Sequence, residues 1–258
     1  MARIIAVANQ KGGVGKTTTS INLAAALAIQ GQAVLVIDMD PQGNATGGLG
    51  IDAASLKHTV YDCLMRGIST SDAIQQTAIP GLQIVPANAD LAGAEVELVA
   101  LTDRETLLKA AIQTLPVAPE CIIVDCPPAL GLLTINALTA ASSVLIPVQC
   151  EYYAMEGLGR LLSNVARIQE SLNPALVLEG ILLTMFDSRN SLARQVSDEI
   201  RSHFKEKVYR TVIPRNVTLA EAPSYGKPVM LYNAASAGAQ AYLDLAKELL
   251  NHGKASSR

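Results

Sequence analysis

One stretch near the N-terminus constrains the fold of this chain more than any other. A short apolar run from Arg3 to Ala8 has the pattern of a buried strand, and the sequence NQKGGVGKTT follows it at residues 9–18. Apolar residues then recur at helical spacing as far as Gln30, and Gly31 ends the predicted helix. A strand, a glycine-rich loop and a helix in this order are the context that a phosphate-binding loop requires.

The residue types in this loop suit a polyphosphate. Glycine has no Cβ, so the backbone can turn tightly and bring its N–H groups close to phosphate oxygens. The helix that begins near Lys16 directs its positive end at the same anion. We expect Lys16 to contact the terminal phosphates and the Thr17 hydroxyl to bind Mg²⁺. The predicted nucleotide-binding residues of the loop are Lys11, Gly12, Gly13, Val14, Gly15, Lys16, Thr17 and Thr18.

Acidic residues end two further apolar runs, 33–38 and 121–125. Ligands bind beyond the carboxyl ends of strands in open α/β sheets, so both positions are candidates for the site. Asp38 and Asp40 flank one residue of an extended segment, so at most one of them faces the phosphates unless the backbone turns. Beside a phosphate-binding loop this segment is a candidate for catalysis, the alternative being a helix cap and turn. Asp125 is expected to hold Mg²⁺ directly or through water.

The rest of the chain alternates runs of strand length with stretches of helical periodicity. Each strand–helix unit takes about 30 residues, as parallel right-handed crossovers do. We expect further strands at 82–86, 143–148, 176–186 and 208–214, and helices at 59–67, 70–77, 91–100, 105–115, 132–140, up to 171 and at 191–204. This pattern predicts a single-domain α/β P-loop NTPase fold at 1–251, with a mostly parallel twisted sheet flanked by helices on both faces and a polar tail at 252–258.

Composition narrows the classes of function. Half of the 258 residues are hydrophobic, which allows a substantial core, and the formal net charge of −3 argues against a constitutively basic nucleic-acid binder. The four cysteines contain no CxxC pair, which indicates buried thiols in a reducing compartment. No apolar run reaches the roughly 18 residues of a membrane span and no signal peptide pattern opens the chain, so we expect a cytoplasmic protein.

The loop departs from the common pattern in an informative way. Gln10 stands where that pattern has a glycine, and Lys11 opens the loop instead. In this respect KGGVGKTT resembles the deviant phosphate loop of the ParA/MinD superfamily. The segments DMDPQGNAT, VDCPP, PVQCEYYAMEGL, LTMFDSR and IPRNVTLAEAPSYGKP also resemble ParA/Soj chromosome-partition ATPases, over residues 3 to about 250.

This resemblance implies an ATPase that uses ATP and Mg²⁺ and forms a nucleotide-sandwich homodimer when ATP is bound. Lys11 would reach the partner subunit's nucleotide, so Lys11, Lys16 and Asp40 are the implied catalytic residues, and Asp40 would position or activate the attacking water. Met185, Pro214 and Asn216 would lie around the adenine. The ATP dimer would bind DNA non-specifically on the nucleoid, and a ParB/Spo0J-type centromere-binding protein would stimulate hydrolysis.

The DNA-binding surface is the least defined part of this prediction. The resemblance implies Arg189, and we add Arg215, Lys227 and Lys247 as candidates near the same face. Many relatives have an arginine where this chain has Thr218, so we expect weaker DNA binding or a rearranged patch. For each basic residue, a solvated surface charge is the alternative interpretation.

Three other functions remain open. A MinD-like ATPase acting on a membrane needs a basic amphipathic C-terminal helix. Asp244 and Glu248 dilute that charge here and favour a helix packed on the domain, so we expect no membrane partner. An iron–sulfur protein needs bridging cysteines, and Cys126 has no second cysteine in a comparable loop. An ATPase that positions a cargo other than a chromosome would have the same sequence features, because a separate adaptor protein determines which cargo is moved.

Overall fold

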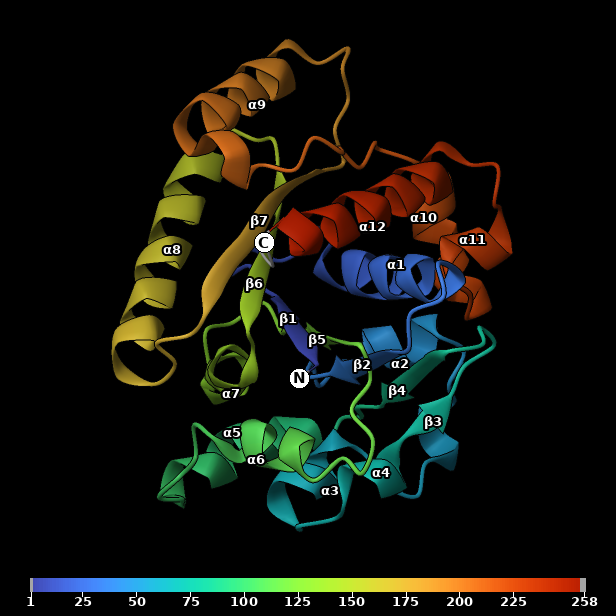
Figure 1. The fold of residues 1–258 in the computed structure, drawn as a ribbon, viewed down its shortest axis with the longest axis vertical. Helices are drawn as coiled ribbons and strands as arrows, with labels where there is room; N and C mark the ends of the chain where they lie inside the picture. The colour runs from blue at the N-terminus through green and yellow to red at the C-terminus, as the bar shows by residue number, and fades with distance from the viewer. Residues whose placement is uncertain (1, 256–258) are drawn as a thin grey trace.

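A seven-stranded sheet forms the centre of the molecule in the computed structural model, which describes residues 2–255 and the side chains of residues 2–251 (Figure 1). The strand order is β3-β4-β2-β5-β1-β6-β7. The strands are β1 (Arg3–Val7), β2 (Val34–Asp38), β3 (Gln75–Gln76), β4 (Leu82–Val85), β5 (Cys121–Asp125), β6 (Ser143–Gln149) and β7 (Val177–Thr184). Every pairing is parallel except that of β3 with β4, which confirms the predicted fold class.

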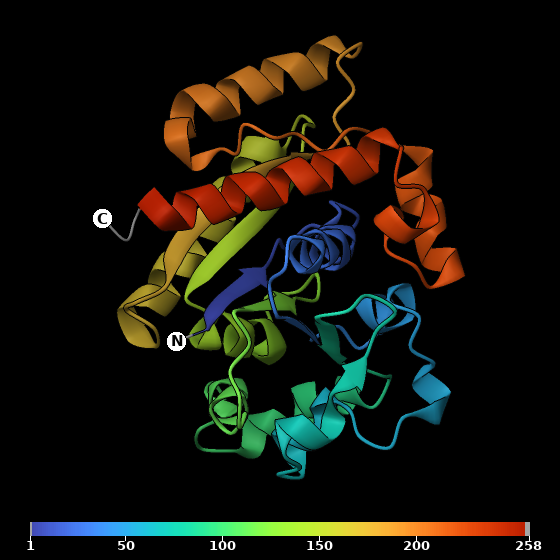
Figure 2. The ribbon, with the colours of Figure 1, turned by 45° about the vertical axis from the view of Figure 1, so that its right-hand side comes forward.

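Helices cover both faces of this sheet (Figures 1 and 2). Successive residues of a strand point to opposite faces, so Ile5 and Val7 pack with one set of helices and Ala6 with the other. The first set comprises α1 (Lys16–Ile29), α2 (Asn44–Gly48), α10 (Val217–Glu221), α11 (Val229–Tyr232) and α12 (Ala237–Ala255). The second comprises α3 (Val60–Met65), α4 (Thr70–Ala73), α5 (Leu91–Glu97), α6 (Leu107–Gln113), α7 (Leu132–Ala140), α8 (Ala154–Ser171) and α9 (Ser191–Phe204).

The register of the central strands brings three chain segments to one edge of the sheet. Val7, the last residue of β1, lies opposite Asp125, the last residue of β5. Asp38, the last residue of β2, lies opposite the same Asp125 on its other side. All residues of β2 and β5 are buried, because helices cover both faces. The loop after β1 and both acids therefore meet at the carboxyl edge of the sheet.

The predicted strand at 208–214 is wrong. Only isolated bridges form there, between Ile181 and Val208 and between Phe186 and Pro214. The segment lies along the edge strand β7, but between these points its residues do not stay in register with it. The Tyr209 ring is buried against Gly180, where a Cβ would overlap it. Packing of this ring and a few separate backbone hydrogen bonds, such as those from the Tyr209 amide to the Ile181 carbonyl and from the Ile213 amide to the Leu183 carbonyl, hold the segment in place without a continuous ladder.

The predicted helix at 70–77 is only partly correct. The helix α4 ends at Ala73, and Gln75–Gln76 then pairs with β4 as the strand β3. Short 3₁₀ turns complete the described structure at Ala53–Ser55 (η1), Leu98–Ala100 (η2), Lys205–Lys207 (η3) and Ala222–Tyr225 (η4).

The C-terminal helix α12 lies beside α1, as both views show (Figures 1 and 2). It buries Tyr242, Leu245 and Leu249 in the core, which confirms the prediction of a helix packed on the domain. None of the described helices has the length and apolarity needed to cross a bilayer. The polar tail predicted at 252–258 overlaps the end of α12 as far as Ala255, and residues 256–258 lie outside the described residues.

Candidate nucleotide-binding site

The loop between β1 and α1 has the backbone geometry of an anion cradle. Gly13 and Gly15 have φ angles of 75° and 86°, in the left-handed region that glycine adopts without strain. Gly15 is the N-cap of α1, and the first turn of this helix has no side-chain cap and no acidic residue. Its N–H groups therefore remain available to an anion, and the helix dipole favours one there.

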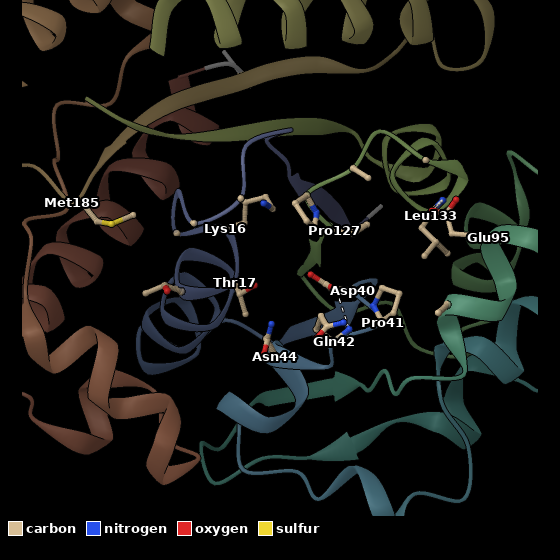
Figure 3. A pocket seen from close by; sticks show the side chains of 18 residues that line it. Lys16, Thr17, Asp40, Pro41, Gln42, Asn44, Glu95, Pro127, Leu133 and Met185 are labelled. Atoms are coloured by element: carbon tan, nitrogen blue, oxygen red, sulfur yellow. Dashed lines mark hydrogen bonds between the residues drawn. The ribbon is translucent and has the colours of Figure 1, made fainter. Parts of the chain in front are cut away.

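This loop forms one wall of a cavity of about 800 Å³ at the carboxyl edge of the sheet (Figure 3). Segments that follow β2 and β5 form the other walls, together with part of α5. The lining residues are Gly12, Gly13, Gly15, Lys16, Thr17, Thr18, Asp40, Pro41, Gln42, Asn44, Ala92, Glu95, Pro127, Pro128, Ala129, Gly131, Leu133 and Met185. Six of the eight loop residues expected at the nucleotide line this cavity.

A second cavity of about 350 Å³ adjoins the first and shares Gly15, Thr18 and Met185 with it. It is lined by Pro214 and Asn216, the other two residues expected at the adenine, and by Tyr242. The Asn216 Oδ1 atom is buried and has no hydrogen-bond partner in the described structure. The two cavities thus place the expected phosphate and base residues side by side.

Val14 and Lys11 do not line either cavity. Val14 is buried, and its carbonyl accepts a 2.8 Å hydrogen bond from the Thr184 hydroxyl, which ties the loop to β7. The Lys11 ammonium group pairs with the carboxylate of Glu151, and both side chains are about half exposed. Lys11 is therefore directed away from the cavity that its own loop wraps.

Lys16 lies at the cavity wall and is only 7% exposed. Its Nζ donates a 3.2 Å hydrogen bond to the Lys11 carbonyl, which holds the side chain across the loop. Burial lowers the pKa of Lys16, and the neighbouring carboxylate of Asp125 opposes that shift. An anion in the cavity would favour the ammonium form of Lys16 for the same reason.

Asp38 and Asp40 have different partners, as their alternation along the chain predicts. The Asp38 carboxylate accepts hydrogen bonds from the Thr46 amide and hydroxyl at 2.9 and 2.8 Å, and from the Asp40 amide at 3.1 Å. It fastens the turn between β2 and α2. Asp40 lines the cavity and accepts a 3.0 Å bond from the Gln42 amide (Figure 3). Of these two carboxylates, Asp40 is therefore the one that can act on a ligand in the cavity.

Asp125 is fully buried behind the loop. Its Oδ1 accepts a 2.7 Å hydrogen bond from the Ser20 hydroxyl of α1, whereas Oδ2 has no hydrogen-bond partner in the described structure. Burial raises the pKa of Asp125, and the nearby Asp38 carboxylate adds to the shift. A buried carboxylate with an unpartnered oxygen fits a cation, although the described residues contain no cluster of three or more acidic, cysteine or histidine side chains that could hold one alone.

Two of the four DNA-binding candidates form ion pairs within the chain. The Arg189 guanidinium makes two bonds, at 2.9 and 2.8 Å, to the Asp187 carboxylate, and Lys247 pairs with Asp244 at 3.0 Å. The Arg215 amide donates to the Phe186 carbonyl at 3.1 Å, so Arg215 lies on the same side of the molecule as the Asp187–Arg189 loop. Arg215 and Lys227 are exposed.

Several lining residues were not predicted from the sequence. Gln42 and Asn44 belong to the turn that Asp38 fastens, and proximity to Asp40 could have indicated them. Glu95 comes from α5, in a segment with no local signal for the site, so only the tertiary structure brings it to the cavity.

The buried parallel sheet, the uncapped helix behind a glycine-rich loop and the acids at the ends of β2 and β5 define a P-loop nucleoside triphosphatase. Comparison with known sequences agrees, since residues 2–178 match the AAA domain family.

The chain is 56% identical to the sporulation initiation inhibitor protein Soj of Bacillus subtilis, over 98% of this chain and 100% of that protein. It is 52% identical to the chromosome partitioning protein ParA of Myxococcus xanthus, over 97% and 88% of the two chains. A crystal structure from Mycobacterium smegmatis with bound ADP and magnesium, described as cobyrinic acid a,c-diamide synthase, is 41% identical with a TM-score of 0.86, covering 100% and 97% of the two chains. This chain belongs to the ParA/Soj family of chromosome-partitioning ATPases.

Proposed function

We propose that this chain binds ATP with Mg²⁺ and hydrolyses it to ADP and phosphate in the partition of a chromosome or plasmid. The observation that carries the proposal is the shared cavity of the glycine-rich loop, Lys16 and Asp40. The names of the close relatives support the biological role, and the M. smegmatis structure with ADP and magnesium supports the ligands.

The two adjoining cavities suit the two ends of ATP. The loop amides, the α1 N-terminus and Lys16 would hold the phosphates. Met185, Pro214 and Asn216 would surround the adenine in the smaller cavity. The unpartnered Asn216 Oδ1 is an acceptor, so it suits the amino group of adenine.

Thr17 and Asp125 would hold Mg²⁺, with the phosphates and water supplying its other ligands. The unpartnered Oδ2 of Asp125 gives this carboxylate the capacity to accept a cation or a metal-bound water. Magnesium, when bound, neutralises charge on the phosphates.

Asp40 would position the attacking water, and Lys16 would stabilise the charge that develops on the phosphates. Asp38 would act on Asp40 only through the backbone, because the Asp38 carboxylate fastens the turn on which Asp40 lies. Contact with the γ-phosphate would order the Asp40 segment, and loss of that phosphate would release it.

Two chains would enclose two nucleotides when ATP is bound. Lys11 is directed out of its own cavity, so it can reach the nucleotide of the partner subunit once it leaves Glu151. The ATP dimer would bind DNA non-specifically through a surface that includes Arg189, Arg215, Lys227 and Lys247, on the nucleoid in the cytoplasm. A ParB/Spo0J-type protein would stimulate hydrolysis and so release the DNA.

The first experiment is DNA co-sedimentation with ATP, ADP and no nucleotide, across a salt titration. We expect binding only with ATP and a steady loss with salt, because phosphate contacts release counterions. The variant Lys16→Ala should abolish both ATP binding and ATP-dependent sedimentation. DNA binding that ignores the nucleotide would contradict the cycle, and no binding in any state would favour an ATPase that positions cargo on another matrix, including a MinD-like membrane cycle.

A further inference from the structure

The wall of the cavity opposite the glycine-rich loop is the segment 126–131, which joins β5 to α7. Pro127 and Pro128 have no N–H group, so this segment has few donors with which to fasten itself by backbone hydrogen bonds. It is nevertheless the direct continuation of Asp125, and Pro127, Pro128, Ala129 and Gly131 all line the cavity. Something outside the segment must fix its position.

A side chain from the helix α5 holds this segment in position. Glu95 of α5 places its carboxylate on the first turn of α7, where Oε2 accepts from the Leu132 amide at 3.3 Å and Oε1 from the Leu133 amide at 3.4 Å. The helix α7 has no acidic residue in its own first turn, so Glu95 supplies the negative charge that its N-terminus favours. Figure 3 shows Glu95 beside Leu133 at the far wall of the cavity.

The neighbouring residue makes room for this contact. A Cβ on Gly131 would overlap both carboxylate oxygens of Glu95, so a larger residue here would force the Glu95 side chain to move from its place on α7. On the other side, the Thr134 hydroxyl donates a 2.6 Å bond to the Ala129 carbonyl. The wall segment is thus fastened from α7 and from α5 together.

The cavity also contains two helix N-termini of different character. That of α1 is uncapped, whereas that of α7 is already occupied by the Glu95 carboxylate. The N-terminus of α1 is therefore the one that remains free to receive a polyphosphate. Glu95 therefore fastens this wall through the N-terminus of α7.

We propose that Glu95 is a positioning residue of this site, which holds the segment 126–131 at the distance from the glycine-rich loop that hydrolysis needs. The inference rests on the proposed function in so far as the reaction is ATP hydrolysis. Glu95 acts through Gly131 and the start of α7, so its loss should affect the chemical step more than the binding of the nucleotide.

The test compares Glu95→Ala, Glu95→Gln and Gly131→Ala in the full chain, with kcat and the Kd for ATP measured for each. We expect Glu95→Ala to lower kcat by about 10-fold or more, since small displacements of a site wall are costly, while the Kd for ATP stays unchanged. Glu95→Gln keeps an acceptor oxygen and should recover part of the loss. Glu97→Ala is the matched control, because Glu97 lies two residues away on α5 and accepts from the Tyr61 hydroxyl on the surface.

A double variant makes the test specific to the Glu95–Gly131 contact. Gly131→Ala should lower kcat in the wild-type background, but add nothing to Glu95→Ala, because the added Cβ then meets no carboxylate. Additive losses, or a wild-type kcat in Glu95→Ala, would overturn the proposal.

Amide hydrogen exchange separates this inference from the proposed function. If the wild-type chain hydrolyses no ATP, the proposed function fails, but the Leu132 and Leu133 amides still report on Glu95. Faster exchange at these amides in Glu95→Ala, and not in Glu97→Ala, supports the positioning role. Unchanged exchange in a folded Glu95→Ala protein overturns it.

Discussion

The ammonium group of Lys11 pairs with the carboxylate of Glu151, 140 residues further along the same chain. Both side chains are about half exposed, so the pair contributes little to stability and can open at small cost. The pair keeps Lys11 outside its own cavity, as the proposed role toward a partner subunit requires.

Replacement of Lys11 should separate nucleotide binding from assembly. We expect Lys11→Ala to bind ATP as the wild type does, because Lys16 and not Lys11 lines the cavity, but to lose ATP-dependent dimerisation and turnover. Light scattering with a slowly hydrolysed ATP analogue measures the dimer. Glu151→Gln is the control for the ion pair and should change the free energy of unfolding by less than about 1 kcal/mol. A Lys11→Ala protein that still dimerises would refute the crossing role.

Asp40 and Asp38 should give opposite phenotypes although one residue separates them. Asp40→Ala should retain ATP binding and the ATP dimer but stop turnover, since its carboxylate faces the cavity. Asp38→Ala should cost about 1–3 kcal/mol of stability, because it leaves the buried Thr46 amide without its acceptor. Steady-state ATPase assays and urea unfolding distinguish the two effects. Undiminished hydrolysis by Asp40→Ala would count against its catalytic role.

A side chain at Gly12 should block the dimer without harming the monomer. A Cβ built on Gly12 meets no atom within 4 Å, and its φ lies outside the left-handed region. Gly12→Val should therefore melt close to the wild-type temperature but fail to dimerise with ATP, because valine would crowd the partner subunit's approach. Gly13→Ala, at a φ of 75°, is the contrasting variant and should be destabilised. A normal ATP-dependent dimer of Gly12→Val would show that this crowding does not occur.

The proposed DNA surface should respond to added positive charge. Thr218→Arg should tighten non-specific DNA binding by the ATP form and steepen its salt dependence. Asp187→Asn should act in the same direction, because it frees the Arg189 guanidinium from a two-bond ion pair. Fluorescence anisotropy with a random duplex, at several salt concentrations, measures both. If neither variant alters the affinity, the DNA-binding surface lies elsewhere.

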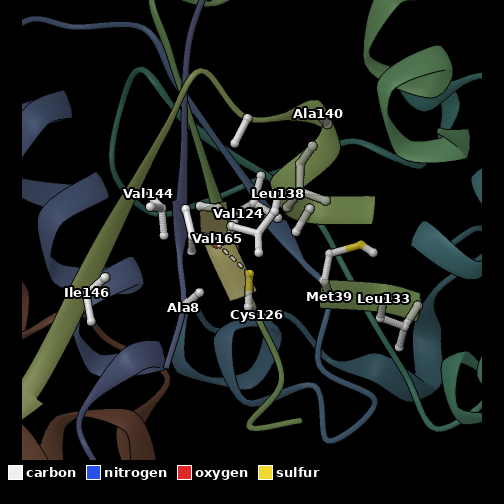
Figure 4. Packing of buried hydrophobic residues seen from close by; sticks show 14 of the residues in the cluster. Ala8, Met39, Val124, Cys126, Leu133, Leu138, Ala140, Val144, Ile146 and Val165 are labelled. Atoms are coloured by element: carbon white, nitrogen blue, oxygen red, sulfur yellow. Dashed lines mark hydrogen bonds between the residues drawn. The ribbon is translucent and has the colours of Figure 1, made fainter. Parts of the chain in front are cut away.

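The four cysteines should be unreactive in the native protein at pH 8. All four are buried free thiols, and Cys126 lies in the core cluster with Ala8, Met39 and Val124 (Figure 4). Burial raises the pKa of Cys63 and of Cys150 to about 11, so about 0.1% of each is thiolate at pH 8. Labelling with a thiol reagent should be slow when folded, accelerate with rising pH and become complete in denaturant. Rapid labelling of native protein would indicate a local opening.

Much of the site could be predicted because its signals are local in the chain. Glycines, Lys16 and Thr17 lie in one loop, and the apolar runs that end in Asp38 and Asp125 indicate which strand ends meet at the ligand edge. The spacing of apolar residues along the chain also predicted most helices and strands. The segment 208–214 was mispredicted, since strand-like composition does not show whether a ladder partner stays in register.

Sequence alone therefore determined the fold class, the phosphate-binding loop and the acids that accompany it. The signals for these features, which are the spacing of apolar residues and the positions of glycines, each extend over only a few neighbouring residues. Tertiary structure alone decided that Lys11 meets Glu151 and that Glu95 reaches α7. These contacts join residues whose separation in the chain carries no information about distance. The first exists only once β1 has paired with β6, and the second only once α5, which follows β4, has packed against α7, which follows β5.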